Sequence, residues 1–207
     1  MFRYETQVKK FLLKWYSVNA RILPWRKKTN KTLANPYFVF VSEYMLQQTT
    51  VNTVKNKFND FVLKWPSVNK LARIKEPEIL KFWSGLGYYS RARNLLKTAK
   101  IINKSFKNKI PQTYDELIQL PGIGDYTAKA ILGIGFNKSV MPLDANIERI
   151  LVRLHAIDQP IIKVKNKLKD LANKFISDKY SSNLIQSFMD YGSAICLPRN
   201  PRCDICG

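Results

Sequence analysis

The chain has 207 residues, with 35 Lys or Arg against 15 Asp or Glu, which gives a formal net charge of +20. A hydrophobic content of 45% excludes general disorder and is enough for the core of one domain or two small ones. The charge indicates a polyanionic partner, most commonly nucleic acid. An anionic membrane is the competing partner. No apolar run approaches the ~20 residues of a spanning helix, so no membrane association is expected.

The first 83 residues are predicted to form a series of helices. Residues 4–19 place apolar side chains on one face, and Leu23-Pro24-Trp25-Arg26 ends that helix ahead of a basic loop over residues 27–31. Pro36 suits the first turn of a helix that continues to Gln48. Further helices follow at three places: residues 51–61, a short run capped by Ser67, and residues 77–83. Alternation with a period of two is almost absent, so the predicted fold class is all-α.

A first glycine hairpin is predicted in Ser84-Gly85-Leu86-Gly87-Tyr88-Tyr89-Ser90, ahead of a helix with apolar residues over 92–102. A similar stretch, Gly122-Ile123-Gly124-Asp125-Tyr126-Thr127, follows later. Two such hairpins could hold two points of a nucleic acid backbone, although chance similarity explains so short a pattern as well as duplication does. Arg91 and Arg93 are candidate phosphate contacts, and a solvated basic face is the alternative.

The second hairpin has clear helix signals on both sides. Thr113 and Glu116 form a capping box before a short amphipathic run over residues 117–120, which Pro121 ends. Gly122 and Gly124 are expected to adopt backbone angles closed to other residues, and a second helix begins near residue 125. The backbone N–H groups at its start suit a phosphate. The alternative is an ordinary helix–helix corner.

The C-terminal third continues the helical pattern. The chain turns at Asn137-Lys138, reaches Asp144, and then forms an amphipathic helix. Residues 163–176 form a basic amphipathic helix, and Ser182 is expected to cap the last one. His155, the one histidine of the sequence, is expected to be a packed or surface residue rather than a catalytic one.

The three cysteines, Cys196, Cys203 and Cys206, all lie in the last dozen residues. Because no cysteine upstream could pair with them, a disulfide scaffold is implausible and a reducing, cytoplasmic setting is expected. Thiols clustered at this spacing are typical of metal ligands.

Two acids could perform chemistry together. Glu43 stands in an apolar helix, where desolvation would raise its pKa and favour the protonated acid; taken alone, an exposed surface glutamate is the simpler interpretation. Asp144 is a lone acid beyond the second hairpin. Glycosidic bond cleavage needs one carboxylic acid to protonate the leaving group and one carboxylate to stabilise an oxocarbenium-like state. Cleavage of the N-glycosidic bond of a purine makes the same demand.

The sequence resembles a known family. The Leu120–Ala128 stretch and Leu143-Asp144-Ala145-Asn146 resemble the signature of the helix-hairpin-helix DNA glycosylases. Within them, the chain is similar to the MutY-type adenine DNA glycosylases, in order through nearly its whole length. Those enzymes excise adenine mispaired with 8-oxoguanine or guanine. The matching blocks are Pro24-Trp25-Arg26, residues 42–49, residues 85–94, the second hairpin and Met189-Asp190-Tyr191-Gly192.

The resemblance implies roles for individual residues. Glu43 would be the acid acting at adenine N7 and Asp144 would stabilise the sugar cation, supported by Tyr126 and Asn146. The residues that would fill the duplex and touch the orphaned guanine are Gln48, Thr49, Leu86 and Tyr88. Without the resemblance, Gln48 is better explained as a helix terminus and Tyr88 as a core aromatic. The other expected DNA-binding residues are Arg26, Arg91, Gly122 and Gly124.

The family's cofactor is a [4Fe–4S] cluster, which takes four thiolates. The resemblance places a fourth cysteine a few residues past Cys206, but the sequence stops at Gly207. We therefore expect a chain cut short, without the family's domain for recognising 8-oxoguanine. The implied fold has two lobes: a helical barrel over residues 24–136, and a second lobe from residues 1–23 and 137–207. A monomer acting on double-stranded DNA in the nucleoid is expected.

Two other functions remain open. A thymine glycosylase acting on T·G mismatches would share the tyrosine hairpin, although Glu43 and Gln47-Gln48-Thr49 argue against it. A non-catalytic DNA-binding module would explain the charge and the hairpins but not the paired acids. Lyase-type relatives carry lysine where Tyr126 stands, so strand cleavage is not expected unless Lys129, one turn on, provides the amine.

Overall fold

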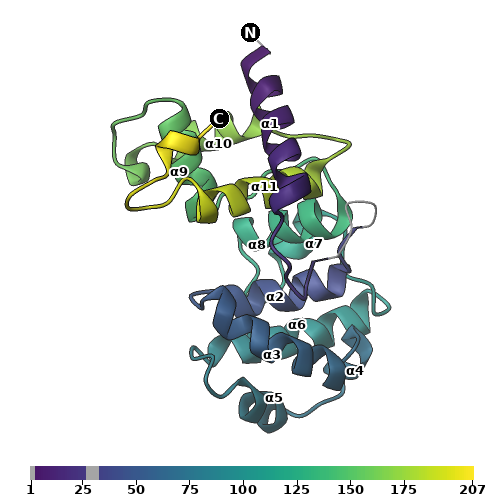
Figure 1. Ribbon diagram of the computed structural model, residues 1–207. Coiled ribbons are helices and arrows are strands. Elements are labelled where there is room, and N and C mark those ends of the chain that lie inside the picture. The colour runs from purple at the N-terminus through teal and green to yellow at the C-terminus, as the bar shows by residue number, and fades with distance from the viewer. Residues whose placement is uncertain (1–2, 27–32) are drawn as a thin grey trace. The chain divides into compact units, whose positions relative to one another are not determined.

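The computed structural model describes residues 3–26 and 33–207, so the basic loop expected over residues 27–31 lies outside the described part. The chain divides into two compact units: residues 22–136, and residues 1–21 together with 137–207. Over the described residues all regular elements are helices and no strand occurs, which confirms the all-α prediction (Figure 1).

The unit of residues 22–136 is built around α2, which is buried on nearly all sides. Asn35 caps this helix by accepting the N–H of Tyr37 at 3.0 Å, and Pro36 occupies its first turn. A close approach lies at Gly135, where a Cβ would stand 3.2 Å from the Cα of Pro36. The elements are α2 (Pro36–Leu46), α3 (Val51–Lys64), α4 (Val68–Ala72), α5 (Glu76–Trp83), α6 (Ser90–Ser105), α7 (Tyr114–Ile118), α8 (Asp125–Ala130) and the π-helical turn η1 (Ile131–Gly135).

Two local predictions differ from the structure, and one element was not predicted. Helix α2 ends at Leu46, and Gln48 takes a positive φ of 53° instead of continuing the helix. The last long helix begins at Ser181 with Tyr180 at its N-cap position, so Ser182 lies within the first turn and does not cap it. The π turn after α8 was not predicted at all.

In the other unit, α1 (Arg3–Asn19) packs along α11 (Ser181–Ala194), and α11 also contacts α9 (Ala145–Leu154) (Figure 1). The end of α1 is tied to α11 through Asp190, which is fully buried and accepts the backbone N–H and the Nε of Arg21 at 2.9 and 2.6 Å. The shorter elements of this unit are η2 (Ile161–Lys163), α10 (Lys165–Asn173) and η3 (Cys203–Ile205).

Among the residues that the structure describes, no helix is both long and apolar enough to span a membrane.

Candidate active site

Glu43 lies on α2 with 6% of its surface exposed. Its neighbours on the helix, Ser42 and Tyr44, are fully buried, so this part of α2 belongs to the core. Glu43 is therefore not the exposed surface glutamate that its sequence alone favoured. The apolar helix predicted a partly desolvated carboxyl group here, and the structure places Glu43 in the core.

The second hairpin is anchored to α2 and α6. The hydroxyl of Tyr44 donates to the carbonyl of Pro121, and the hydroxyl of Thr98 donates to the same oxygen at 2.9 Å. Gln47 Nε2 donates to the carbonyl of Gly122 at 3.2 Å. Burial raises the pKa of Tyr44, which keeps its hydroxyl a donor. The helix that carries Glu43 therefore also holds the glycine turn.

The two glycines of this hairpin are not equivalent. Gly122 has a φ of 80°, and a Cβ there would lie 2.9 Å from the ring of Tyr44 and 3.0 Å from Asn94 Cβ. Gly124 has a φ of −98° and open space around a Cβ, so the prediction of a special conformation there is wrong. The turn needs glycine only at its first position, where the chain both reverses and packs closely.

The predicted capping box is formed in part. The hydroxyl of Thr113 accepts the backbone N–H of Glu116 at 3.4 Å, as expected. The Glu116 carboxylate accepts the Thr113 hydroxyl at 2.6 Å, where a capping box would have it accept the Thr113 backbone N–H.

Asp144 is the N-cap of α9, a role that its spacing did not reveal. Its Oδ1 accepts the backbone N–H of Ile147 at 2.8 Å, and its Oδ2 accepts Nδ2 of Asn146 at 2.9 Å. Both carboxylate oxygens are therefore held in a fixed orientation at the positive end of the helix dipole. The structure contains the hydrogen bond from Asn146 to Asp144, and the catalytic role of Asn146 stays a prediction.

Asn146 is held in turn by Arg149, which sequence reasoning missed. Arg149 Nη2 donates to Asn146 Oδ1 and to the carbonyl of Gly192, each at 2.7 Å. Its Nε donates to the carbonyl of Cys196 at 2.7 Å. A chain of hydrogen bonds thus runs from the Asp144 carboxylate to the start of the cysteine segment. The arginine lies one helical turn after Asn146 on α9, a spacing that could have indicated the contact.

Tyr126 lies on α8, in the unit of residues 22–136, and is half-buried. Its support of Asp144, which belongs to the other unit, stays a prediction. Lys129 follows on α8 and forms an ion pair with Asp125 Oδ1 at 2.9 Å.

Two exposed residues stand at strained turns in the same unit. Gln48 and Tyr88 have φ values of 53° and 48°, a region that residues other than glycine seldom adopt. Tyr88 is 62% exposed, so it is not the core aromatic that its sequence alone favoured.

Thr49 is half-buried and donates to the carbonyl of Leu86 at 3.4 Å. Leu86 itself is 4% exposed, so its side chain is a core residue in this structure and not one available to fill a duplex.

Arg91 does not face solvent, contrary to both interpretations of the sequence. It is 6% exposed, and its guanidinium donates to backbone carbonyls at the end of α2 and in the 86–88 loop. The prediction of a phosphate contact is therefore wrong for this residue, because its donors are used inside the protein. Burial lowers the pKa of Arg91.

Arg26 ends a turn, and its backbone N–H donates to the carbonyl of Leu23 at 2.9 Å. The phosphate contact expected of Arg26 stays a prediction.

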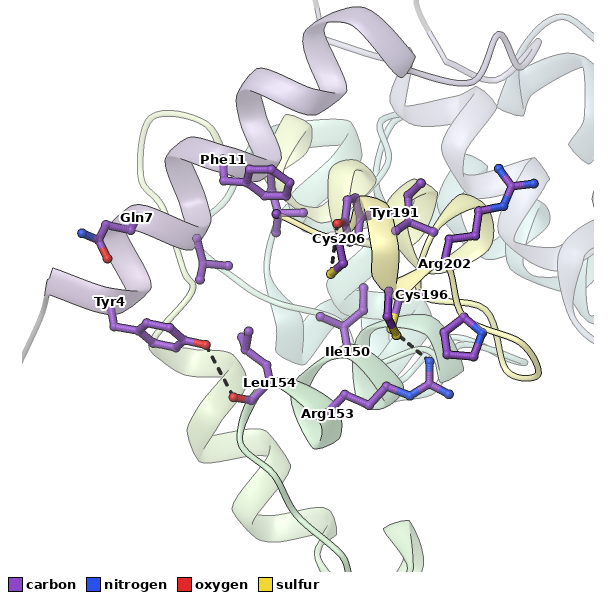
Figure 2. A pocket seen from close by; sticks show the side chains of 16 residues that line it. Tyr4, Gln7, Phe11, Ile150, Arg153, Leu154, Tyr191, Cys196, Arg202 and Cys206 are labelled. Atoms are coloured by element: carbon purple, nitrogen blue, oxygen red, sulfur yellow. Dashed lines mark hydrogen bonds between the residues drawn. The ribbon is translucent and has the colours of Figure 1, made fainter.

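The three cysteines line one cavity of about 440 Å³ in the unit of residues 1–21 and 137–207. Cys196 accepts from Arg153 Nη1 at 3.2 Å, and Cys206 accepts from the hydroxyl of Tyr191 at 3.3 Å (Figure 2). Burial, with the hydrogen bond to Cys206, raises the pKa of Tyr191. Its hydroxyl therefore remains a donor to the sulfur.

The cysteines do not make a complete site for a cluster. Over residues 3–26 and 33–207, no group of three or more His, Cys, Asp or Glu side chains is placed to hold a metal ion. A [4Fe–4S] cluster takes four thiolates, and the sequence supplies three. The cavity therefore offers part of a ligand set.

Comparison with known proteins places this geometry in a family. The model of the "HhH-GPD superfamily base excision DNA repair protein" family matches residues 41–174. The adenine DNA glycosylase of Buchnera aphidicola subsp. Schizaphis graminum is 42% identical over 198 residues, covering 94% of this chain and 56% of that protein. The adenine DNA glycosylase of Homo sapiens is 37% identical over 215 residues, covering 100% of this chain and 39% of that protein. The chain thus spans about half the length of the bacterial relative.

Solved structures agree on the fold. A thermostable thymine-DNA glycosylase matches with a TM-score of 0.86 at 25% identity, covering 98% of this chain and 92% of that one. Endonuclease III in a non-covalent DNA complex matches with a TM-score of 0.78 at 20% identity, covering 100% and 92%. These matches confirm the predicted helix-hairpin-helix glycosylase fold.

Proposed function

Since the chain belongs to the HhH-GPD superfamily of base excision DNA repair proteins, we propose that it removes adenine mispaired with 8-oxoguanine or guanine in DNA. The observation that carries the proposal is the pair of acids: Glu43 buried on α2, and Asp144 oriented by Asn146 and the start of α9. The adenine DNA glycosylases among its relatives support the choice of base. Joint action of the two acids on one nucleotide is part of the proposal.

Double-stranded DNA is the proposed partner, bound by a monomer. A base inside the duplex cannot reach a carboxylic acid, so the adenine must first swing out of the stack. Gln48 and Tyr88 are exposed on tight turns of one unit and are the residues we propose to occupy the gap. The turn at Gly122 and the N–H groups that follow it would receive a phosphate. Arg26 is a further proposed DNA contact, and Thr49 is proposed to touch the orphaned guanine.

The reaction needs only groups that this chain supplies and water. Glu43 as a carboxylic acid protonates N7 of the extruded adenine, which makes the base a better leaving group. The bond between C1′ of the sugar and N9 then breaks, and its electron pair leaves with the adenine. The Asp144 carboxylate stabilises the positive charge that develops on the sugar. Water adds to C1′ and passes a proton to the Glu43 carboxylate, which restores the acid and leaves an abasic site.

The DNA strand is proposed to stay intact. Strand cleavage by a lyase begins with an amine that attacks C1′ to form a Schiff base. Tyr126 has no amine, and the Nζ of Lys129 is held by the Asp125 carboxylate at 2.9 Å. An Nζ engaged in this contact is not free to attack C1′.

For the cysteine cavity, we propose that Cys196, Cys203 and Cys206 are protein ligands of the [4Fe–4S] cluster that the resemblance implies. The set is short of the four thiolates such a cluster takes. No step of the proposed reaction passes through this group.

The test is excision from a single duplex carrying adenine opposite 8-oxoguanine, with the abasic product detected by alkaline cleavage. Matched duplexes with A·G, T·G and A·T pairs decide the specificity. Excision of thymine from T·G would favour the second candidate, which the match to a thymine-DNA glycosylase supports. Glu43→Gln is the control for a contaminating activity, because it keeps the size of the side chain but cannot deliver a proton.

A non-catalytic DNA-binding module is the remaining alternative. It predicts binding to all four duplexes without release of any base. Binding in either case should weaken steeply as salt is raised, because neutralising several phosphates releases counterions. A flat salt dependence would remove nucleic acid as the main partner.

A further inference from the structure

The guanidinium of Arg91 joins two segments that lie far apart in the sequence. Its Nη1 donates to the carbonyl of Met45 at 2.8 Å, to that of Tyr44 at 3.3 Å, and to that of Gln47. These carbonyls end α2, where helical backbone groups lack partners of their own. A buried positive charge at this point also suits the negative end of the helix dipole.

The other side of the same group holds the glycine loop. Nη2 donates to the carbonyls of Leu86 and Gly87 at 2.7 and 3.0 Å, and Nε donates to that of Tyr88 at 3.4 Å. The guanidinium carbon also lies 5.6 Å from the centre of the Tyr88 ring. One side chain therefore fixes both the backbone and the ring of Tyr88.

The two segments lead to Gln48 and Tyr88, which are both exposed and both have a positive φ. Gln48 directly follows the Gln47 carbonyl that Arg91 binds, and Tyr88 supplies a bound carbonyl itself. Both have a positive φ, which costs free energy and persists only where surrounding contacts impose it. Arg91 binds the carbonyl of Gln47, directly before Gln48, and the carbonyl of Tyr88 itself.

We infer that Arg91 is a positioning residue that sets Gln48 and Tyr88 in register with each other for entry into the duplex. The inference rests on the proposed function, because it assigns the role of those two residues there. Lysine cannot replace arginine in this role: an ammonium has three donors at one point, whereas the guanidinium fork spans both segments.

The test compares Arg91→Lys with the wild-type chain, and Arg73→Lys serves as a control because Arg73 is an exposed arginine of the same unit. Single-turnover excision of adenine opposite 8-oxoguanine should fall about 10²-fold in Arg91→Lys, the scale expected from a misplacement of about 1 Å. Affinity for an undamaged duplex should stay close to wild type, and the loss of excision should exceed what the loss of stability, read from the melting temperature, accounts for. A proportional loss of stability and of affinity for undamaged DNA would show a purely structural role and overturn the inference.

A double-mutant cycle decides whether Arg91 acts through the two residues. In a chain that already carries Gln48→Ala and Tyr88→Ala, the change Arg91→Lys should have little further effect on excision. A full additional loss in that background would overturn the inference.

A measurement without DNA separates this inference from the proposed function. In protein labelled with 3-fluorotyrosine, the ¹⁹F resonance of Tyr88, identified by its loss in Tyr88→Phe, should shift in Arg91→Lys. An unchanged resonance would overturn the positioning role even if the chain excises adenine. If the wild-type chain does not excise adenine, the proposed function is overturned. The ¹⁹F shift of Tyr88 would then still test whether Arg91 positions that residue.

Discussion

Gly192 and Asn146 are packed so closely that a Cβ at Gly192 would lie 2.5 Å from the Cβ of Asn146. Asn146 is the residue that donates to the Asp144 carboxylate at 2.9 Å. A methyl group on α11 would therefore displace the partner of the proposed catalytic carboxylate. We expect Gly192→Ala to lower single-turnover excision about tenfold or more through this displacement.

The control for Gly192→Ala is Ser193→Ala, the next residue on α11, whose side chain is exposed and whose hydroxyl donates to carbonyls of its own helix. Asn146→Ala should reduce excision similarly, and combining it with Gly192→Ala should add little. Full activity in Gly192→Ala would contradict the role assigned to the Asn146 contact.

The two acids should be indispensable to excision but not to binding. Glu43→Gln cannot donate a proton, and Asp144→Asn removes the negative charge that would face the sugar cation. General acid catalysis alone is typically worth ~10²–10⁴-fold, so each loss should be large in single-turnover assays. Mismatch binding, measured by fluorescence anisotropy, should survive both changes. Retained excision in either variant would reject that residue's role.

Lys129 should not form a covalent bond with DNA. Its Nζ is held in an ion pair with Asp125, so borohydride should trap no complex between wild-type protein and a product duplex. Asp125→Asn is the informative variant, because it removes the carboxylate partner. A trapped complex in the wild type that disappears in Lys129→Ala would identify a lyase.

The cysteine cavity should hold iron poorly. Cys196, Cys203 and Cys206 provide three thiolates where a [4Fe–4S] cluster takes four. After reconstitution with iron and sulfide, we expect less than a full complement of iron per chain and a visible absorbance that fades in air. Changing Cys206 to serine should lower the iron content further. A stable, fully loaded cluster in the 207-residue chain would contradict this expectation.

His155 should make the stability of the protein depend on pH on the acid side. Its ring packs edge-on against Tyr4 and Phe175, and its Nε2 is buried without a hydrogen-bond partner among the described residues. Burial and then the charge of Lys174 lower the pKa of this imidazole. The folded protein therefore binds the proton less readily than the unfolded chain does.

The sign follows from that difference. The contribution of neutral His155 to the free energy of unfolding is fully present above the pKa of about 6.5 that the imidazole has in the unfolded chain. It is lost as the pH falls through the lower pKa of the imidazole in the folded protein. Glu5 opposes this shift, and Lys167 adds to it. Between about pH 7.5 and about pH 5, the melting temperature of His155→Phe should fall less than that of the wild type. Equal falls in the two proteins would show that other titratable groups govern the stability at acidic pH.

The sequence indicated features that depend on local chemistry. Pro36 and the apolar run behind it predicted the helix that carries Glu43, and Thr113 predicted a cap that the structure contains. The glycine pattern predicted a tight turn that Gly122 makes. Such features follow from the preferences of a few neighbouring residues, so they can be recognised in the order of the letters.

Tertiary structure decided the features that depend on distant partners. An arginine at the start of a helix reads as a phosphate contact, but Arg91 is buried because the end of α2 and the 86–88 loop bring six backbone carbonyls to it. The side chain of Leu86 is likewise buried in the fold and not exposed to solvent. Gly124 adopts a backbone conformation that other residues can also adopt. By itself the sequence determined which residues could act as acids, donors and turns. Only the fold determined which of them remain available, because a donor that is satisfied inside the protein has nothing left to offer DNA.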